Sequence, residues 1–379
     1  MWKQILCALL AVCCLTGTAA AAELQVAAPS AILMERTTGT VLYEKNAHER
    51  LPPASVTKVM TLLLVMEALE TGRISWDDMV IASDTAAAKG GSQIYLEPGE
   101  QMTMDEMLKS VVVSSANDCA TALAEHIAGS EDAFVDMMNA RAKELGMNAT
   151  HFVNCTGLDD DPDAAEHLTS AHDIAVMSRE LLKHDDIRKY TTIWMDTVRN
   201  GAFGLSNTNK LVRFYEGTTG LKTGYTSGAG HCLSASAMRD GVEYVAVVLR
   251  CANSNERFQS AKQLLDYGFA NYTLAEPDLK TVIPEVPVVL GTAETIVPVP
   301  ADAAPLLIEK SMKNAITTRV EVAEQVKAPV EAGQRLGTMT MQANGEPLAA
   351  IPLVAPEAVA RKVWWDVTKE LLSVLCFRK

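Results

Sequence analysis

The first 276 residues show strand patterns at both ends and helical patterns between them, and this order is the strongest constraint on the fold. A hairpin pattern runs from Ala31 to Tyr43, with turn residues around Thr38–Gly39. Two more strand patterns return much later, at Cys232–Met238 and Val242–Leu249, on either side of the two-residue turn Asp240–Gly241. Strands so far apart in the sequence predict an α+β domain whose one sheet is closed by its two ends.

Helical patterns fill the middle of this domain, and one more follows its last strand. The first begins at Ala54–Ser55, directly after Pro52 and Pro53, and ends at Gly72. Apolar residues occupy nearly all of its faces, which predicts a helix in the centre of a core. The other helical patterns span about Met104–Ile127, Glu131–Leu145 and Asn255–Tyr267.

The composition changes after about Glu276. Five prolines between positions 277 and 300 interleave with valine-rich pieces, which excludes helix over most of this stretch. Short strand patterns continue through Thr317–Val322 and Gly337–Met341. We therefore predict a first domain over residues 23–276 and a small all-β domain over 277–355, and the chain is long enough for each to bury a core of its own.

The N-terminal segment 1–22 has the pattern of a secretory signal peptide. Lys3 supplies a short positive region, Ile5–Leu15 is an apolar run, and the small residues Thr18–Ala22 precede Glu23. The apolar run is too short to cross a bilayer, whose hydrocarbon core is about 30 Å thick. The sequence therefore predicts export, with cleavage near Ala22–Glu23.

The C-terminal segment 356–379 has the pattern of an amphipathic helix. Apolar residues from Ala360 to Leu375 recur at helical spacing, opposite charged residues such as Arg361 and Lys369. Adjacent Trp364 and Trp365 and a basic end favour a helix that lies in a membrane interface. The alternative is a helix packed on the β domain or on a second copy of the chain.

Charge and cysteine content exclude several classes of function. The net charge of −14 argues against a nucleic-acid partner, because a phosphate backbone requires a basic face. No Cys-x-x-Cys pair or zinc-type spacing occurs after the signal segment, so we expect no structural metal. Cys232 and Cys251 fall on two neighbouring predicted strands but out of register, which favours buried free thiols over a disulfide.

Three short motifs follow one another in the first domain: Ser55-Val-Thr-Lys58, Ser115-Ala-Asn117 and Lys222-Thr223-Gly224. Residues three apart share a helix face, so the Lys58 amine can reach the Ser55 hydroxyl. Apolar surroundings and a second nearby cation favour the neutral form of a lysine, which can then take the serine proton. Each motif alone is weak, because Ser55 also suits a helix N-cap and Lys58 a surface lysine.

Together, these motifs resemble those of the penicillin-binding proteins and serine β-lactamases. The resemblance extends over Pro53–Thr61, Ser114–Asp118, His151–Leu158 and Lys222–Gly230, which look like the low-molecular-mass serine-type D-alanyl-D-alanine carboxypeptidases of the peptidase S11 family. It covers nearly the whole mature chain. It implies a penicillin-binding transpeptidase domain of the serine β-lactamase type, then a β-rich domain and an amphipathic tail.

The resemblance also implies roles for the motif residues. Ser55 would be the nucleophile that forms an acyl-enzyme, Lys58 its general base, and Ser115 a proton relay towards the leaving amine. Asn117 would hold the substrate amide. His167 fits a loop that borders the site in the family, with a catalytic or a structural role left open.

The substrate-binding residues implied by the resemblance lie later in the chain. Lys222, Thr223 and Gly224 would line an edge strand on which a peptide or a β-lactam adds as a further strand. The backbone N–H groups of Ser55 and Tyr225 would form the oxyanion hole. Arg257 matches the arginine that binds the substrate carboxylate, and its alternative is an ordinary surface arginine.

The resemblance implies an enzyme that removes the terminal D-Ala from peptidoglycan stem pentapeptides without a cofactor. It also implies a location on the outer face of a bacterial cytoplasmic membrane and covalent binding of β-lactams. A β-lactamase is disfavoured, because residues 167–170 after Glu166 depart from the Glu-x-x-Leu-Asn loop of class A enzymes. A sensor that is acylated without turnover, and an endopeptidase, stay open as alternatives. The sequence does not indicate an oligomeric state.

Overall fold

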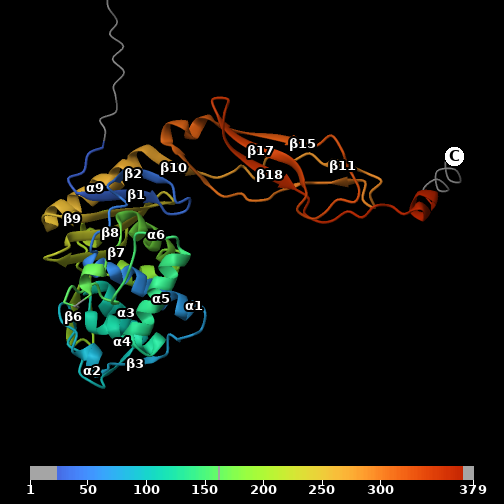
Figure 1. Ribbon diagram of the computed structural model, residues 1–379. Coiled ribbons are helices and arrows are strands. Elements are labelled where there is room, and N and C mark those ends of the chain that lie inside the picture. Colours follow the sequence, from blue (N-terminus) through green and yellow to red (C-terminus); the bar gives the residue numbers. More distant parts are fainter. Residues whose placement is uncertain (1–23, 161–162, 370–379) are drawn as a thin grey trace, which may run out of the picture.

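The computed structural model describes residues 24–160 and 163–369, so the predicted signal segment 1–22 lies outside the described residues. An antiparallel five-stranded sheet forms the frame of the first domain (Figure 1). Its strands, in spatial order, are β2 (Val41–Lys45), β1 (Ser30–Glu35), β9 (Val242–Cys251), β8 (Gly230–Arg239) and β7 (Thr218–Thr226). β1 pairs with β9, which confirms that sequence-distant strands close the sheet.

Both faces of this sheet are covered, because its central strand alternates between two cores. Val245 and Val247 of β9 pack into the core of the helical part, whereas Tyr244 and Ala246 pack into a second core under helix α9 (Ser254–Asn271). The turn at Asp240–Gly241 joins β8 to β9 as the sequence predicted, with both residues at positive φ.

The helical part lies on the opposite face of the sheet from α9 (Figure 1). Its helices are α1 (Lys58–Glu70), α2 (Asp84–Ala87), α3 (Met104–Val113), α4 (Asn117–Ala128), α5 (Glu131–Glu144), α6 (Ala171–Leu181) and α7 (Arg188–Thr191). The short helix α8 (Leu211–Phe214) lies on the α9 side instead, where Leu211 packs into the second core. The 3-10 turns are η1 (Ala54–Thr57), η2 (Ala164–Glu166), η3 (Asp185–Ile187) and η4 (Lys310–Ala315), the last in the β-rich part. Two small two-stranded antiparallel sheets pair β3 (Met79–Ile81) with β4 (Gln101–Thr103), and β5 (Met195–Val198) with β6 (Phe203–Ser206).

The expected continuous helical region Met104–Ile127 is interrupted, and this is a correction to the sequence prediction. α3 ends at Val113 and α4 begins at Asn117, because Ser115 between them has a φ of 62°. A left-handed residue cannot continue a right-handed helix. The interruption falls on the second motif.

The β-rich part extends away from the sheet end of the first domain (Figure 1). A two-stranded junction pairs β10 (Tyr272–Ala275) with β14 (Leu306–Glu309). Beyond it lies a four-stranded sheet with the order β13 (Val299–Pro300), β18 (Glu346–Val354), β17 (Arg335–Ala343) and β15 (Ile316–Val322). A three-stranded sheet has the order β12 (Thr295–Ile296), β11 (Val286–Val289) and β16 (Val326–Lys327). Two separate apolar clusters support these sheets, so this part has its own core.

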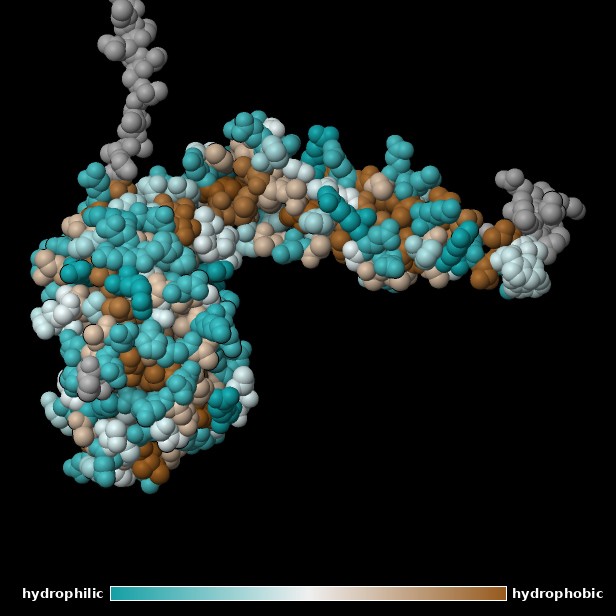
Figure 2. Space-filling model, viewed as in Figure 1, coloured by the Kyte–Doolittle hydropathy of each residue, from teal (hydrophilic) through white to brown (hydrophobic). Residues whose placement is uncertain are grey.

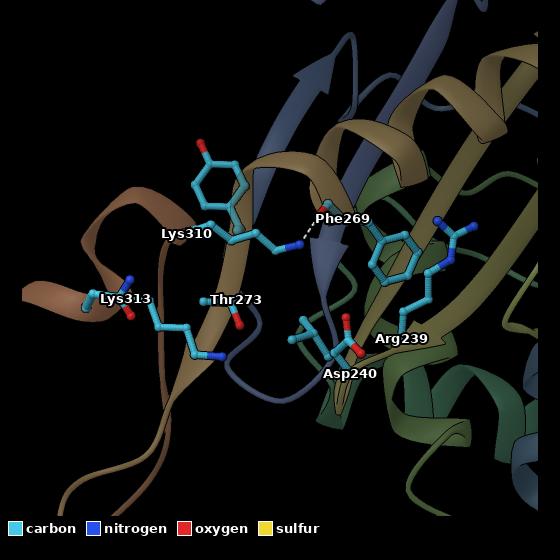
Figure 3. Close-up of a pocket in the computed structure, with 9 residues that line it drawn as sticks. Arg239, Asp240, Phe269, Thr273, Lys310 and Lys313 are labelled. Carbon is cyan, nitrogen blue, oxygen red and sulfur yellow. Dashed lines mark hydrogen bonds between the residues drawn. The ribbon is translucent and has the colours of Figure 1, made fainter.

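A hollow of about 630 Å³ lies at the junction of the two parts, between the end of the first sheet and η4 (Figure 3). The Lys310 amine crosses it to donate to the Phe269 carbonyl. The Arg239 guanidinium lies 4.5 Å from the Phe269 ring centroid and donates to the Glu216 carbonyl. Contacts from both parts therefore converge on the end of α9.

The tail is not helical over 356–363, which corrects the prediction of a helix from Pro356. Val359 is buried in the β-rich core, and its N–H donates to the Val330 carbonyl at 2.9 Å. The helix starts at Trp364 and is described as far as Lys369, and the remaining predicted helix lies outside the described residues. Within the described part, no helix is both long and apolar enough to cross a membrane.

Candidate active site

The centre of the site is the 3-10 turn η1, which presents Ser55 just before helix α1. Pro53 precedes the turn, and Ala54 has a φ of 49°, so the chain changes direction sharply before Ser55. Lys58 is the first residue of α1, and its Nζ donates to Ser55 Oγ at 3.1 Å. The three-residue spacing thus brings the two groups together as predicted.

Lys58 is completely buried, and its surroundings change its chemistry. Burial lowers the pKa of this lysine from 10.5 to about 7, while the nearby Cys155 and Asp118 partly oppose the shift. A pKa near 7 leaves a large neutral fraction at physiological pH. The lysine can therefore accept the proton of the serine that it contacts.

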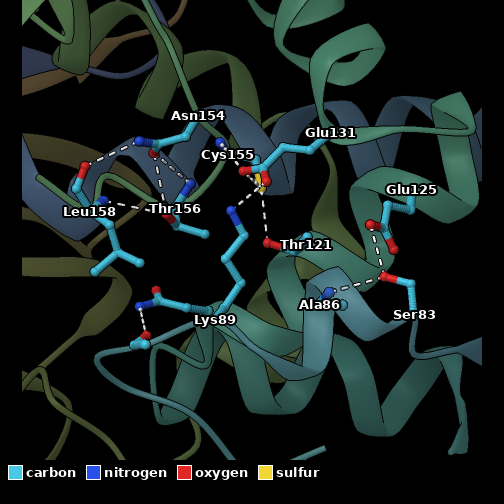
Figure 4. A network of polar contacts seen from close by, with 12 residues as sticks. Ser83, Ala86, Lys89, Thr121, Glu125, Glu131, Asn154, Cys155, Thr156 and Leu158 are labelled. Carbon is cyan, nitrogen blue, oxygen red and sulfur yellow. Dashed lines mark hydrogen bonds and ion pairs between the residues drawn. The ribbon is translucent and has the colours of Figure 1, made fainter. Parts of the chain in front are cut away.

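A tight turn at residues 154–158 fixes the Lys58 amine from the other side. Figure 4 shows the polar contacts within this turn. The Thr156 carbonyl accepts from Lys58 Nζ at 2.7 Å. The Asn154 Oδ1 accepts from the Thr156 N–H, the Thr156 hydroxyl and the Gly157 N–H, and its Nδ2 donates to the Leu158 carbonyl. One buried asparagine therefore determines where the Thr156 carbonyl points.

Gly157 allows this turn to lie against the nucleophile turn. Its φ is 80°, and a Cβ there would come within 1.9 Å of the Ala54 carbonyl oxygen. Only glycine fits such a position. The 154–158 turn therefore contacts both Lys58 and the segment that carries Ser55.

A network of polar contacts links this turn to helices α4 and α5 and to Lys89, which follows α2 (Figure 4). Glu131 Oε1 accepts from both the backbone N–H and the thiol of Cys155, at 3.2 Å each. Lys89 forms a 2.6 Å ion pair with Glu131. Cys155 Sγ also lies 3.7 Å from the Thr121 hydroxyl.

Ser115 and Asn117 lie at the interruption between α3 and α4, and each presents a polar atom without a protein partner. Ser115 Oγ is buried and unpaired, and so is Asn117 Oδ1. The Asn117 Nδ2 donates to the Gly90 carbonyl at 2.8 Å, which fixes the amide plane. Buried polar atoms of this kind lower the free energy of the protein when a ligand pairs with them. Both residues are thus suited to contact a substrate.

The third motif lies on β7, which is an edge strand of the five-stranded sheet. The Thr223 hydroxyl donates to the Thr208 hydroxyl at 2.7 Å, and the Thr208 N–H donates to the Val113 carbonyl at the end of α3. These bonds connect the edge strand to the segment that carries Ser115. The unpaired side of β7 can accept a further strand.

Gly224 and Lys222 bring β7 against the nucleophile. A Cβ on Gly224 would lie 2.6 Å from the Pro53 carbonyl and 3.1 Å from the Ser55 nitrogen. Lys222 is buried with its Nζ donating to the Thr223 carbonyl. Its pKa lies well below the ordinary value because of burial, and because the charges of Lys58 and Arg257 oppose a third cation.

Arg257 is buried behind the edge strand rather than at the surface, so the alternative of an ordinary surface arginine is wrong. Its Nη1 donates to the carbonyls of Gly224 and Cys232, at 3.0 and 3.2 Å, which ties β7 to β8. Its Nε is buried without a partner. Tyr225, by contrast, is 59% exposed at the surface.

His167 has contacts that indicate a positioning role. Its Nδ1 accepts from the Val153 N–H at 3.1 Å, so the proton is on Nε2, which donates to the Thr57 hydroxyl at 2.7 Å. That hydroxyl donates in turn to the Ala54 carbonyl. Burial lowers the pKa of His167 to about 4, so the ring is neutral near pH 7. The structure thus makes His167 a support of the nucleophile turn.

The described cysteines Cys119, Cys155, Cys232 and Cys251 are buried free thiols, as the register of β8 and β9 predicted for Cys232 and Cys251. The roles of Asn154, Glu131 and Thr57 are not predictable from the sequence, because no motif spacing assigns these residues a contact. Asn154 and Thr57 do lie within the segments that resemble the family.

Comparisons with known proteins agree with this geometry. Residues 16–253 match the family model described as "D-alanyl-D-alanine carboxypeptidase", and residues 278–361 match "Penicillin-binding protein 5, C-terminal domain". The chain is 43% identical to the D-alanyl-D-alanine carboxypeptidase DacF of Bacillus subtilis, over 88% of this chain and 86% of that protein.

Solved structures give the same result for the fold. Penicillin-binding protein 5 of Haemophilus influenzae superposes with a TM-score of 0.78 at 29% identity, covering 89% of this chain and 98% of that one. Penicillin-binding protein D2 of Listeria monocytogenes, in its ampicillin-bound form, superposes on 65% of this chain with a TM-score of 0.59 at 31% identity, and 99% of that chain is covered. The predicted penicillin-binding fold with a β-rich second domain is confirmed, and the chain belongs to the D-alanyl-D-alanine carboxypeptidase family, the serine enzymes of peptidase family S11.

Proposed function

We propose that Ser55 is the nucleophile of this carboxypeptidase and that neutral Lys58 is its general base. The observation that carries the proposal is the 3.1 Å contact between Lys58 Nζ and Ser55 Oγ, together with the lowered pKa of Lys58. Lys58 takes the proton as Ser55 Oγ attacks the carbonyl of the penultimate D-Ala. The C–N bond then breaks, D-alanine leaves with a proton delivered through Ser115, and water hydrolyses the ester.

The substrate peptide adds as a strand along β7. Lys222, Thr223 and Gly224 face it, and Asn117 binds its amide through the unpaired Oδ1. The Gly224 position within contact distance of the Ser55 nitrogen supports an oxyanion hole built from the N–H groups of Ser55 and Tyr225.

Arg257 serves the terminal carboxylate of the substrate in this proposal. Its buried position behind Gly224 places a permanent positive charge near the end of the substrate strand. The natural substrate is a peptidoglycan stem pentapeptide ending in D-Ala-D-Ala. β-Lactams acylate the same serine, and the ampicillin-bound form of the Listeria monocytogenes relative supports this part of the proposal.

The test is release of free D-alanine from a D-Ala-D-Ala peptide by the wild-type protein and by Ser55→Ala. Steady release by the wild type and none by Ser55→Ala supports the proposal. Mass spectrometry after penicillin treatment locates the adduct, and an adduct on a serine other than Ser55 would refute the mechanism. A burst of one D-alanine per enzyme without turnover would instead favour an acylated sensor.

We further propose that the exported enzyme is held on the outer face of the cytoplasmic membrane by the amphipathic tail. The exposed Val363, Trp364 and Trp365 at its start support this. Because Val359 belongs to the β-rich core, a tail-less variant should end at Lys362. That variant is expected to release D-alanine normally but to stay in the supernatant when vesicles are sedimented.

A further inference from the structure

The far end of the β-rich part exposes apolar side chains next to the start of the tail. Val289 ends strand β11 and Leu290 is the turn residue that follows it; they are 38% and 42% exposed, whereas Val286 and Val288 of the strand are buried. Figure 2 shows apolar residues beside hydrophilic ones at this end, where the tail leaves the domain. We name the exposed set Val289, Leu290, Val363, Trp364 and Trp365 the distal patch.

Backbone bonds join the two halves of the distal patch. The Lys362 N–H donates to the Leu290 carbonyl, and the Thr292 N–H donates to the Ala360 carbonyl, at 2.8 Å each. Val363 therefore begins beside Leu290. The tail leaves the domain at a fixed point rather than through a free linker, so the two halves present one surface.

Leu290 has a backbone conformation that a leucine rarely adopts. Its φ is 59°, in the left-handed region that favours glycine and asparagine. The exposed part of the Leu290 side chain is not stabilised by burial in the core. A side chain that is unfavourable both for the turn and for water points to a partner at this position.

Charge at the same end selects the kind of partner. Lys327 pairs with Val289 across the parallel strands, and Arg361 and Lys362 immediately precede the tail helix. Residues 357–379 carry five basic against three acidic side chains, although the whole chain has a net charge of −14. Apolar and tryptophan side chains bordered by basic ones fit an anionic lipid surface.

We propose that the distal patch is a membrane-contact surface in which Leu290 inserts among anionic lipids beside the tail. This rests on the membrane anchoring proposed above and extends it from the tail to the β-rich domain itself. Two contacts on one rigid surface hold the domain at a defined orientation, whereas a tail alone would act as a flexible tether. The active site is then carried at the opposite end of the molecule (Figure 1).

The test is co-sedimentation of the full-length protein with vesicles of phosphatidylcholine containing phosphatidylglycerol. Leu290→Glu places a charge in the patch, and Leu290→Asn removes the apolar side chain while suiting the positive φ. Leu279→Glu is the matched control, because Leu279 is 63% exposed but lies just after β10, near the junction. D-alanine release and the melting temperature of each variant report whether it folds.

We expect both Leu290 variants to bind vesicles about tenfold more weakly than wild type, and the Leu279 variant to change by less than about twofold. Equal binding of wild type and both Leu290 variants would overturn the role of the patch and leave anchoring by the tail intact. Full-length protein that does not sediment with vesicles at all would refute the anchoring itself, and the present proposal with it.

Discussion

The lowered pKa of Lys58 predicts a pH profile for acylation that an ordinary lysine could not produce. With a pKa of about 7, roughly half of the Lys58 side chains are neutral near pH 7, and about one in a hundred near pH 5. The second-order rate constant for acylation by penicillin should thus fall about fiftyfold between these pH values and level off above about pH 8. An exposed lysine would give no plateau below about pH 10.

The assay is stopped-flow acylation with a fluorescent penicillin, whose carboxylate stays ionised over this range. His167 does not compete for the assignment, because its pKa is lowered to about 4. Lys58→Arg serves as the control, since a guanidinium keeps the charge but cannot accept the proton, and its rate should be lower by orders of magnitude. A wild-type rate that climbs steadily beyond about pH 9, or near-normal acylation by Lys58→Arg, would refute the assignment of Lys58 as base.

Further predictions concern the residues that support Ser55 and Lys58. Asn154→Ala should slow acylation about tenfold or more and shift the midpoint of the pH profile, because the Thr156 carbonyl that contacts Lys58 loses its support. The control is Asn139→Ala, which removes hydrogen bonds to the Phe152 backbone nearby and should lower the melting temperature without moving the midpoint. Gly224→Ala should abolish most acylation, because its Cβ meets the Pro53 carbonyl at 2.6 Å, while Gly228→Ala, with its nearest atom at 3.6 Å, should acylate normally. His167→Ala should reduce stability and rate but keep the pH midpoint, and loss of the acidic limb would show instead that His167 titrates in catalysis. Lys58→Met should raise the melting temperature more at about pH 6 than at about pH 9. The pKa of Lys58 is lower in the folded state than in the unfolded state, so the unfolded state binds more protons between about pH 7 and 10.5. The destabilisation caused by the buried lysine therefore decreases as the pH rises through this range. An equal shift at both pH values would contradict the last expectation.

Local patterns predicted the elements whose signal is contained in a short stretch of chain. The strand patterns on either side of Asp240–Gly241 predicted the β8–β9 hairpin, with the correct register as far as Leu233 and Val248, beyond which a register shift places His231 opposite Cys251. The apolar run after Pro53 predicted the buried helix α1. The interruption at Ser115 was missed, because residues 104–127 continue a helical pattern and a left-handed φ leaves no compositional trace outside glycine and asparagine. The tail was assigned a helix too early, because apolar residues from Ala360 onward have a helical spacing, whereas Val359 just before them is held in the β-rich core by a bridge to Val330.

The candidate site was predicted as a set of residues, but its chemistry depends on contacts that the sequence does not encode locally. The spacing of Ser55 and Lys58 indicates that they can meet, and nothing in that spacing indicates the depth of burial that lowers the lysine pKa. The second contact of the amine comes from Thr156, 98 residues away. Only the folded chain brings that carbonyl to Lys58.

The contacts of Glu131 suggest why so many buried polar residues surround this site. Glu131 accepts from the Cys155 backbone, one residue before the carbonyl that holds Lys58, and pairs with Lys89, one residue before the Gly90 carbonyl that holds Asn117. A single carboxylate thus connects the segment that fixes the base to the segment that fixes the substrate amide. Each hydrogen bond in such a network contributes only about 1 kcal/mol to stability. Its larger effect is geometric, because the base and the amide ligand cannot shift independently while the network is intact.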